Sequence, residues 1–172
     1  DSGLPIIAST GGLTNQEVDK LVSFLMHRAC DFSLMHCVSI YPTPDGTCNL
    51  MNIQNFKSRY QNIEVGWSTH ETPEDTLQIG LALAVGASMF ERHIGLETEE
   101  IKLNQYSSTP EQLRLWLDAY DRAHLVLGSD TRDKIQQIEL DSLKSLKRGV
   151  FAKRKIEAHE ELGEHNTYFA FP

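Results

Sequence analysis

Two histidines occupy positions at which their imidazole rings could share one chemical task. His70 directly follows residues 65–69 (VGWST), and His93 closes residues 86–93 (GASMFERH). Both runs are short, largely apolar and prone to form strands, and both end at a polar cluster. Parallel strands of one sheet or barrel bring their carboxyl ends together, where α/β proteins build their sites. The sequence therefore predicts that the two imidazoles converge on one pocket.

Capping residues mark the helices that must position these runs. A Thr-x-x-Glu capping box opens the first helix, and Thr-Pro pairs open the third and the fourth. The predicted helices cover residues 14–30, 51–60, 72–86 and 109–128. The predicted strands before them cover residues 4–8, 32–37, 63–67 and 88–92. Candidate core positions of the last helix are Leu113, Trp116, Leu117, Tyr120 and Leu127.

Four strand-to-helix units in succession indicate an α/β fold with a parallel sheet. A complete (β/α)8 TIM barrel needs about 250 residues, so four units correspond to half of one. Periodicity alone leaves open whether the chain forms half a barrel or a small open sheet. The pattern changes beyond Gly128, where a polar, helical segment leads into short strands. The chain begins without Met, and we interpret it as a piece of a longer protein.

Composition excludes several classes of partner. The 172 residues carry a formal net charge of −8, which argues against nucleic acid or an anionic membrane as the main partner. No signal peptide is visible, and no apolar run approaches the roughly 20 residues of a membrane span. The three cysteines are odd in number and lack metal-ligand spacing. Reduced thiols in a cytoplasmic protein are the simplest interpretation, with core packing as their ordinary role.

Four segments together carry a resemblance to a known family. They are residues 5–11 (PIIASTG), 36–44 (HCVSIYPTP), 65–70 (VGWSTH) and 86–93 (GASMFERH). In this order they resemble the second half of the sialic acid synthases (N-acetylneuraminate synthases), a family that includes members named for spore-coat polysaccharide synthesis. The resemblance implies the C-terminal half of a (β/α)8 TIM barrel over residues 1–128, a linker over 129–146, and the start of a β-rich, antifreeze-like (SAF) domain over 147–172. It also implies that the site needs the missing N-terminal half of the barrel.

The family resemblance implies a reaction and a metal. Its members condense phosphoenolpyruvate with an N-acylated hexosamine to form a nonulosonic acid, here for surface polysaccharide. His70 and His93 match the pair that holds a divalent ion, usually Mn²⁺, with Mg²⁺ and Co²⁺ as alternatives. Imidazole suits such an ion, and open coordination positions would let it polarise the sugar aldehyde. For a single histidine, a hydrogen-bonded packing role would be the ordinary alternative.

The same resemblance assigns the substrate contacts. Ser9, Ser39 and Ser68 lie after three successive predicted strands and match positions that bind phosphoenolpyruvate, while Tyr41 matches a sugar-contacting tyrosine. Glu91 matches a carboxylate near the reacting centre, where it could move a proton or orient substrate. Without the resemblance, the serines could equally be loop or cap residues, and the tyrosine could be a core residue.

Other polar residues near these positions have simpler interpretations. Arg92 could merely pair with Glu91, its neighbour in the chain. His36 lies inside its strand and is expected to be a hydrogen-bonded histidine of the barrel interior. The remaining four histidines show no comparable setting and are expected at the surface: His27, His124, His159 and His165.

Three positions depart from the family pattern. Thr69 stands where aspartate usually precedes the first metal histidine, and Leu103 stands where a Gly-x-Asp segment usually supplies a carboxylate. Phe171 stands where the partner subunit of the family's homodimer inserts an arginine over the sugar's N-acyl group. An aromatic ring cannot reproduce the hydrogen bonds of a guanidinium group. We therefore expect an acceptor other than ordinary N-acetylmannosamine.

Two functions from different classes remain open from the sequence. One is a metal-dependent synthase, which the intact histidine pair favours. The other is a degenerate barrel that serves as a non-catalytic scaffold or sugar-binding module, which the three replaced positions favour. A different barrel lyase or aldolase would be favoured by a lysine at a strand end, and these strand ends carry none.

Overall fold

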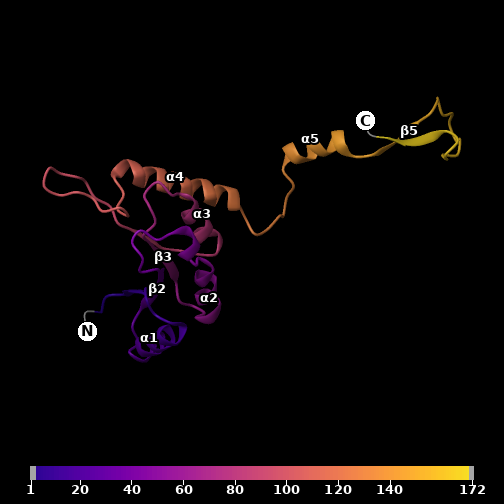
Figure 1. The fold of residues 1–172 in the computed structure, drawn as a ribbon. Helices are drawn as coiled ribbons and strands as arrows, with labels where there is room; N and C mark the ends of the chain where they lie inside the picture. Colours follow the sequence, from indigo (N-terminus) through magenta and orange to yellow (C-terminus); the bar gives the residue numbers. More distant parts are fainter. Residues whose placement is uncertain (1–2, 171–172) are drawn as a thin grey trace. The chain divides into compact units, whose positions relative to one another are not determined.

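The computed structural model describes residues 3–170, and its contacts divide the chain after Gly128 into two units (Figure 1). The first unit contains one parallel sheet whose strands follow one another in chain order. These strands are β1 (Ile6–Ser9), β2 (Phe32–Cys37), β3 (Val65–Thr69) and β4 (Phe90–Arg92). The sheet is curled in the manner of half a barrel.

One helix follows each strand of this sheet. The helices are α1 (Asn15–His27), α2 (Met51–Arg59), α3 (Leu77–Ala84) and α4 (Pro110–Leu127), and a short 3-10 turn η1 (Asp45–Thr47) precedes α2. The capping box of α1 is present, with Thr14 and Glu17 as its two members, and a second capping box opens α4. This alternation of strand and helix confirms the α/β fold.

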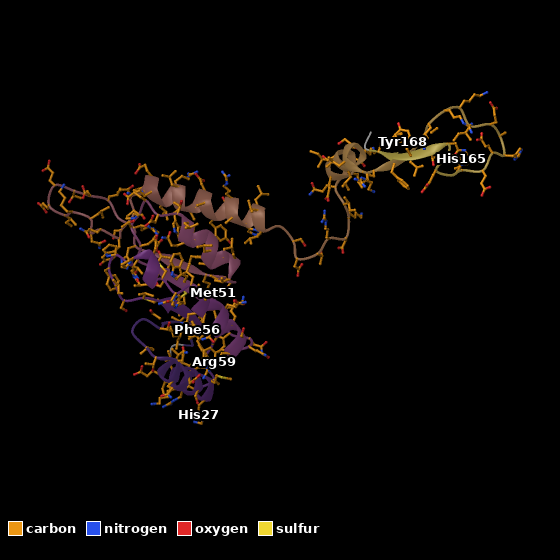
Figure 2. All side chains as sticks on the ribbon, turned by 45° about the vertical axis from the view of Figure 1, so that its right-hand side comes forward. His27, Met51, Phe56, Arg59, His165 and Tyr168 are labelled. Atoms are coloured by element: carbon orange, nitrogen blue, oxygen red, sulfur yellow. The ribbon has the colours of Figure 1, made fainter. Side chains whose placement is uncertain are left out.

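The hydrophobic core lies between the helices and one face of the sheet. Leu34, Val65 and Trp67 reach it from the strands, and Phe56 reaches it from α2 (Figure 2). Because side chains alternate along a strand, the opposite face of the sheet carries a different set. Ile7 on that face is 65% exposed. The uncovered face of the sheet therefore corresponds to the inside of a barrel.

Gly66 allows two of these strands to pack closely. A Cβ atom at this position would lie 2.6 Å from the carbonyl oxygen of Met89 and would also collide with the side chain of Met35. Such distances are shorter than a van der Waals contact, so only glycine fits between these neighbours. This close approach holds the chain before β4 against β3. Each of these two strands is followed directly by one of the two histidines.

The third predicted helix begins later than its Thr-Pro signal indicates. Residues 72–86 were expected to be helical from Thr72 onward, but α3 begins at Leu77. The amide of Asp75 instead donates to the Thr72 carbonyl at 3.0 Å, and the Thr72 hydroxyl donates to the Asp75 carboxylate at 2.9 Å. The side chain of Asp75 therefore stabilises a turn, which carries the chain from the sheet to the helix layer.

Helix α4 contacts the core along a narrower stripe than its sequence predicts. Trp116 is buried, and Leu113 and Tyr120 pack against the core at helical spacing. Leu117 and Leu127 do not, since they are 45% and 49% exposed. Their assignment to the core was wrong because only one face of α4 meets α3 and the sheet.

The second unit is a helix followed by a hairpin. It contains α5 (Gln137–Leu146) and the antiparallel pair β5 (Gly149–Ala152) and β6 (Thr167–Ala170). Buried Asn166 organises the connection, because its side-chain amide donates to the Glu161 carbonyl at 2.9 Å and accepts from the Gly163 amide at 2.9 Å. Strands were expected in this region, and its identity as an SAF domain stays a prediction. Phe171 lies outside the described residues.

Among the described helices, none combines the length and the apolarity that crossing a bilayer requires. The four histidines expected at the surface are exposed, and Figure 2 marks two of them, His27 at the end of α1 and His165 near β6.

Candidate active site

The ends of β3 and β4 bring His70 and His93 together. Their ring centroids lie 5.2 Å apart, and the two ring planes are inclined by 47°. Each histidine follows its strand by one residue, and the strands are parallel neighbours in which Thr69 pairs with Arg92. The pair therefore lies at the carboxyl edge of the sheet.

His70 is the buried member of the pair, and His93 is exposed. The Nδ1 atom of His70 lies 3.9 Å from the Cys37 sulfur, and the nearby backbone of Val38 favours the protonated ring and so partly opposes the lowering of its pKa. Burial lowers the pKa of His70, and the nearby His93 lowers it further. His70 is thus a neutral imidazole near pH 7, which is the form that binds metals.

An aromatic cluster surrounds the histidine pair. The ring of Tyr41 lies 4.4 Å from that of His70, and the ring of Tyr106 lies 5.1 Å from those of both Tyr41 and His93. Tyr41 is 50% exposed, so core packing does not explain it. Nothing in the sequence spacing marks Tyr106, because it comes from the irregular segment between β4 and α4.

The open face of the sheet carries the predicted Ser9, Ser68 and Glu91. Ser68 and Glu91 are paired neighbours on β3 and β4, and Glu91 shares with Ser9 and Met35 the lining of a cavity of about 460 Å³. Both serines lie within strands and not after them, which corrects the expected boundaries. Ser68 is buried, whereas Glu91 is exposed.

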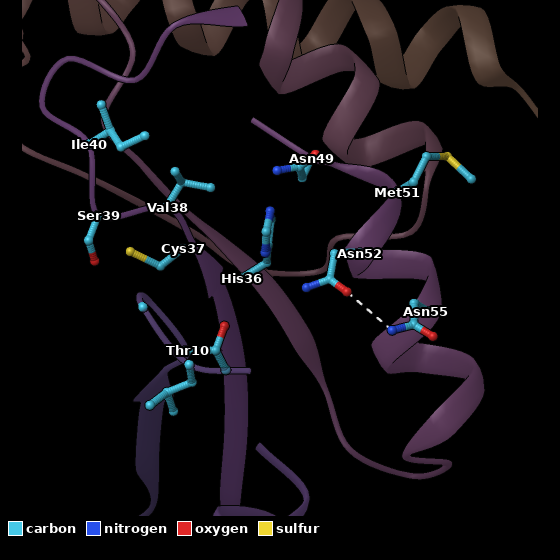
Figure 3. Close-up of a pocket in the computed structure, with 12 residues that line it drawn as sticks. Thr10, His36, Cys37, Val38, Ser39, Ile40, Asn49, Met51, Asn52 and Asn55 are labelled. Carbon is cyan, nitrogen blue, oxygen red and sulfur yellow. Dashed lines mark hydrogen bonds between the residues drawn. The ribbon is translucent and has the colours of Figure 1, made fainter. Parts of the chain in front are cut away.

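Ser39 lies in the loop after β2 and lines a different cavity of about 720 Å³ (Figure 3). This cavity extends from the loop after β1 to the first half of α2, where Asn52 accepts a hydrogen bond from Asn55 at 3.1 Å. A Cβ atom at Gly11 would lie 2.5 Å from the Ser39 hydroxyl oxygen. The absence of a side chain at Gly11 therefore leaves space for this hydroxyl group.

His36 lies on the wall of the same cavity and faces the helices. Its Nε2 is 2.8 Å from the Cys48 carbonyl oxygen, and its ring meets the edge of Phe56 on α2. The expectation of a hydrogen-bonded histidine is correct, but its place in the barrel interior was wrong. His36 shares a strand face with Leu34, which belongs to the core. Burial lowers the pKa of His36, and the bond to Cys48 partly opposes this.

Arg92 pairs with Glu71 and not with Glu91. Both members of this ion pair are buried, and the Glu71 side chain is fully enclosed. Arg92 also donates to the Ser108 hydroxyl at 2.6 Å, and its guanidinium carbon lies 5.4 Å from the centre of the Trp116 ring. Burial raises the pKa of Glu71, and the charge of Arg92 counteracts this shift. The expected pairing of Arg92 with Glu91 fails because successive side chains of β4 face opposite ways.

Two of the departures from the family pattern have clear positions. Thr69 is buried on the helix side of β3, where its hydroxyl lies 3.5 Å from the Arg92 guanidinium group. Leu103 packs over Gly95 and lines a cavity of about 570 Å³ beside the start of α4.

The histidine pair fits a metal that takes its remaining ligands from outside the described residues. Within residues 3–170, no three or more His, Cys, Asp or Glu side chains are close enough to hold an ion together. Imidazole nitrogens bind first-row metals at about 2.1 Å, so rings 5.2 Å apart can share one ion. Its other positions would be filled by water or substrate oxygens.

Comparison with known proteins decides the family. Residues 1–132 match the NeuB family. The chain belongs to this family. This NeuB chain is 46% identical to the putative spore coat polysaccharide biosynthesis protein E of Chromobacterium violaceum, with a TM-score of 0.82 over 99% of its residues. The resemblance to sialic acid synthases is confirmed.

Two further relatives carry informative names. The NeuB chain is 30% identical to the N-acetylneuraminic acid (sialic acid) synthetase of Leptospira borgpetersenii, with a TM-score of 0.71 over 84% of its residues. It is 34% identical over 64% of its residues to the N-acetylneuraminate-9-phosphate synthase of Drosophila melanogaster. The chain spans 51% of the Chromobacterium chain and 50% of the Leptospira chain, and its match covers 30% of the Drosophila protein.

Proposed function

We propose that the complete protein containing this chain condenses phosphoenolpyruvate with an N-acylated hexosamine to form a nonulosonic acid for surface polysaccharide. The observation that carries the proposal is the meeting of His70 and His93 at adjacent strand ends in a member of the NeuB family. The names of the relatives support nonulosonic acid synthesis as the general reaction.

His70 and His93 are the residues that would hold a divalent ion, with Mn²⁺ as the first candidate. A bound ion of this kind would supply Lewis acidity toward the aldehyde oxygen of the open-chain sugar. Burial keeps His70 neutral, and its contacts with Val38 and Cys37 fix the orientation of its ring. These contacts are the outer interactions that usually orient a metal-binding histidine.

Residues of the open sheet face would act on phosphoenolpyruvate. The Ser68 and Ser9 hydroxyls can donate to its carboxylate or phosphate oxygens, and Glu91 can accept or return a proton in the cavity beside them. The enol carbon forms the new C–C bond to the sugar's aldehyde carbon. The aldehyde oxygen takes up a proton and becomes a hydroxyl group. Water adds to the resulting cation with loss of a proton, and phosphate leaves as the ketone forms.

The rest of the barrel would have to supply the positive charge that phosphoenolpyruvate requires. The chain has a net charge of −8, and the open sheet face presents hydroxyls and Glu91 but no lysine at its strand ends. Oxyanions of a phosphate are normally bound by arginine or lysine. We therefore propose that the strands missing from this half barrel contribute these cations and complete the site.

The degenerate scaffold is the alternative, and one structural observation weakens it. Thr69 faces the helix layer and contacts Arg92, so the missing aspartate does not leave a gap in the open face of the sheet. Leu103 remains as the replaced position within the described residues, and it lies in the cavity beside the start of α4.

Equilibrium binding of Mn²⁺ to the complete protein tests the metal part of this proposal. We expect His70→Ala and His93→Ala each to abolish binding, while His27→Ala, at the exposed end of α1, leaves it unchanged. Wild-type protein that is folded but does not bind Mn²⁺ would contradict the assignment.

A further inference from the structure

A buried ion pair lies directly behind the two histidines. Glu71 follows His70 in the chain, and Arg92 precedes His93. The side chains of the pair are 0% and 2% exposed, whereas the other ion pairs of the described residues lie at the surface, with at least one member more than 40% exposed.

The alternation of side chains explains this arrangement. On β4, Arg92 faces the helices while its neighbours Glu91 and His93 face the other way. At the end of β3, Glu71 lies on the helix side while His70 turns toward His93. The ion pair therefore ties together the two backbone segments that carry the histidines.

Arg92 also connects these strands to the segment before α4. Its guanidinium group donates to the Ser108 hydroxyl at 2.6 Å and to the Thr72 carbonyl at 3.5 Å. The Ser108 amide in turn donates to the His93 carbonyl at 2.9 Å. The contacts of Arg92 thus join residues that flank the two histidines to the segment that holds Tyr106.

A contribution to the free energy of folding does not by itself explain this buried ion pair. Taking two charges out of water costs free energy, and replacing a buried ion pair by apolar residues is often neutral or stabilising. A buried pair does fix geometry, because one guanidinium group must satisfy a carboxylate and several oxygens in fixed directions.

We propose that Glu71 and Arg92 are positioning residues, which hold His70 and His93 at the separation needed to share one divalent ion. The inference rests on the proposed function, since it concerns the metal pair of that site. We further infer that Glu71 supplies the carboxylate that an aspartate at position 69 would otherwise supply. The Thr69 hydroxyl lies 3.5 Å from the same guanidinium group, so a carboxylate at that position would reach it.

The position of the carboxylate gives a rescue experiment. In the complete protein, Glu71→Thr removes the counter-charge of Arg92, and the double variant Thr69→Asp/Glu71→Thr returns a carboxylate from the neighbouring position on the same side of β3. Mn²⁺ affinity is measured from the free-ion electron paramagnetic resonance signal, and folding is measured by circular dichroism.

We expect Glu71→Thr to weaken Mn²⁺ binding by about 10- to 100-fold, as the loss of an outer contact typically does. The double variant should return to within about threefold of wild type.

A matched control removes an ion pair far from the histidines. Asp19 on α1 pairs with Arg59 on α2 at 2.6 Å, and Asp19→Asn should leave Mn²⁺ affinity unchanged. If Glu71→Thr does not fold, Glu71→Gln, which keeps the size of the side chain, takes its place in the comparison with the rescued variant.

Three outcomes would overturn the inference. The first is wild-type affinity in a folded variant that lacks the Glu71 carboxylate. The second is a folded double variant that binds Mn²⁺ as weakly as the single variant. The third is a wild-type protein that binds no Mn²⁺, and this result would overturn the proposed metal site as well. In that case the His70→Ala variant behaves like wild type, which distinguishes this outcome from the other two.

Discussion

The ring of Tyr106 stands at 90° to the ring of His93, with centroids 5.1 Å apart. His93 is exposed and follows a strand of three residues, so this contact and the one with His70 are the ring contacts that restrain its side chain among the described residues. Tyr106 is held in turn by the segment that ends at Ser108, which Arg92 anchors.

Removing the Tyr106 ring should therefore disturb His93 more than removing the Tyr106 hydroxyl. Edge-to-face aromatic pairs contribute about 0.5–1.5 kcal/mol, and 1.4 kcal/mol is about tenfold in an equilibrium constant. We expect Tyr106→Ala to lower kcat/KM of the complete enzyme by up to about tenfold. Tyr106→Phe keeps the ring and should stay within about twofold of wild type. Equal losses in both variants would show that the hydroxyl carries the role.

Burial of His36 should make the unfolding free energy depend on pH. Its folded pKa lies below the ordinary value of 6.5, because burial disfavours the charged ring. Between 6.5 and the folded pKa, the unfolded chain binds the extra proton, so stability falls as the pH drops through this window. Above 6.5 both states are neutral at this site.

The variant His36→Gln cannot take up a proton at this position. It should therefore lose less stability than wild type when the pH is lowered. Its amide can still donate to the Cys48 carbonyl, which accepts from His36 in the native protein. Urea unfolding at pH 7.5 and at pH 5.5 measures the difference. Identical pH dependence in the two proteins would mean that other groups, including His70, account for the loss.

The core should be far more sensitive at Phe56 than at another phenylalanine of the same unit. Phe56 is 1% exposed between α2 and the sheet, whereas Phe24 on α1 is 56% exposed. We expect Phe56→Ala to lower the free energy of unfolding by about 3–5 kcal/mol. Phe24→Ala should cost about 1 kcal/mol or less, since it leaves no buried cavity. Denaturant unfolding with both variants tests the assignment, which similar losses would contradict.

Gly66 should tolerate no side chain, because a methyl group there meets the carbonyl oxygen of Met89, the residue before β4. The expected loss for Gly66→Ala is about 1–3 kcal/mol, as for other overpacked sites. Gly46 in η1 has open space around it and serves as the control, since Gly46→Ala adds a methyl group that meets nothing within 4 Å. A thermal unfolding midpoint for Gly66→Ala equal to that of Gly46→Ala would show that β3 and β4 have room to move apart.

Local signals in the sequence predict most of the first unit. The Thr14 capping box places α1, and the apolar run of β2 is found with its observed bounds. These features depend on neighbours within a few residues of one another, so the sequence displays them directly. The start of α3 was misplaced because the turn at Thr72 uses the same residue types as a helix cap.

Contacts between residues that are far apart in the chain could not be predicted from the sequence. The Glu71–Arg92 pair joins residues that are 21 apart, and it depends on which face of the sheet each side chain takes. Tyr106 reaches the site from an irregular segment without periodicity. Strand alternation alone places His36 on the same face as Leu34, toward the helices, so the orientation of this histidine can be read from the sequence.

Phosphate release from phosphoenolpyruvate by the complete protein is the most direct test of the central claim. The assay contains Mn²⁺ and a panel of N-acylated hexosamines, and it compares wild type with His70→Ala and His93→Ala. The account predicts release that requires a sugar and both histidines, and the panel then identifies the acceptor. A folded wild-type protein that binds Mn²⁺ but releases no phosphate with any sugar would contradict it and favour the degenerate scaffold.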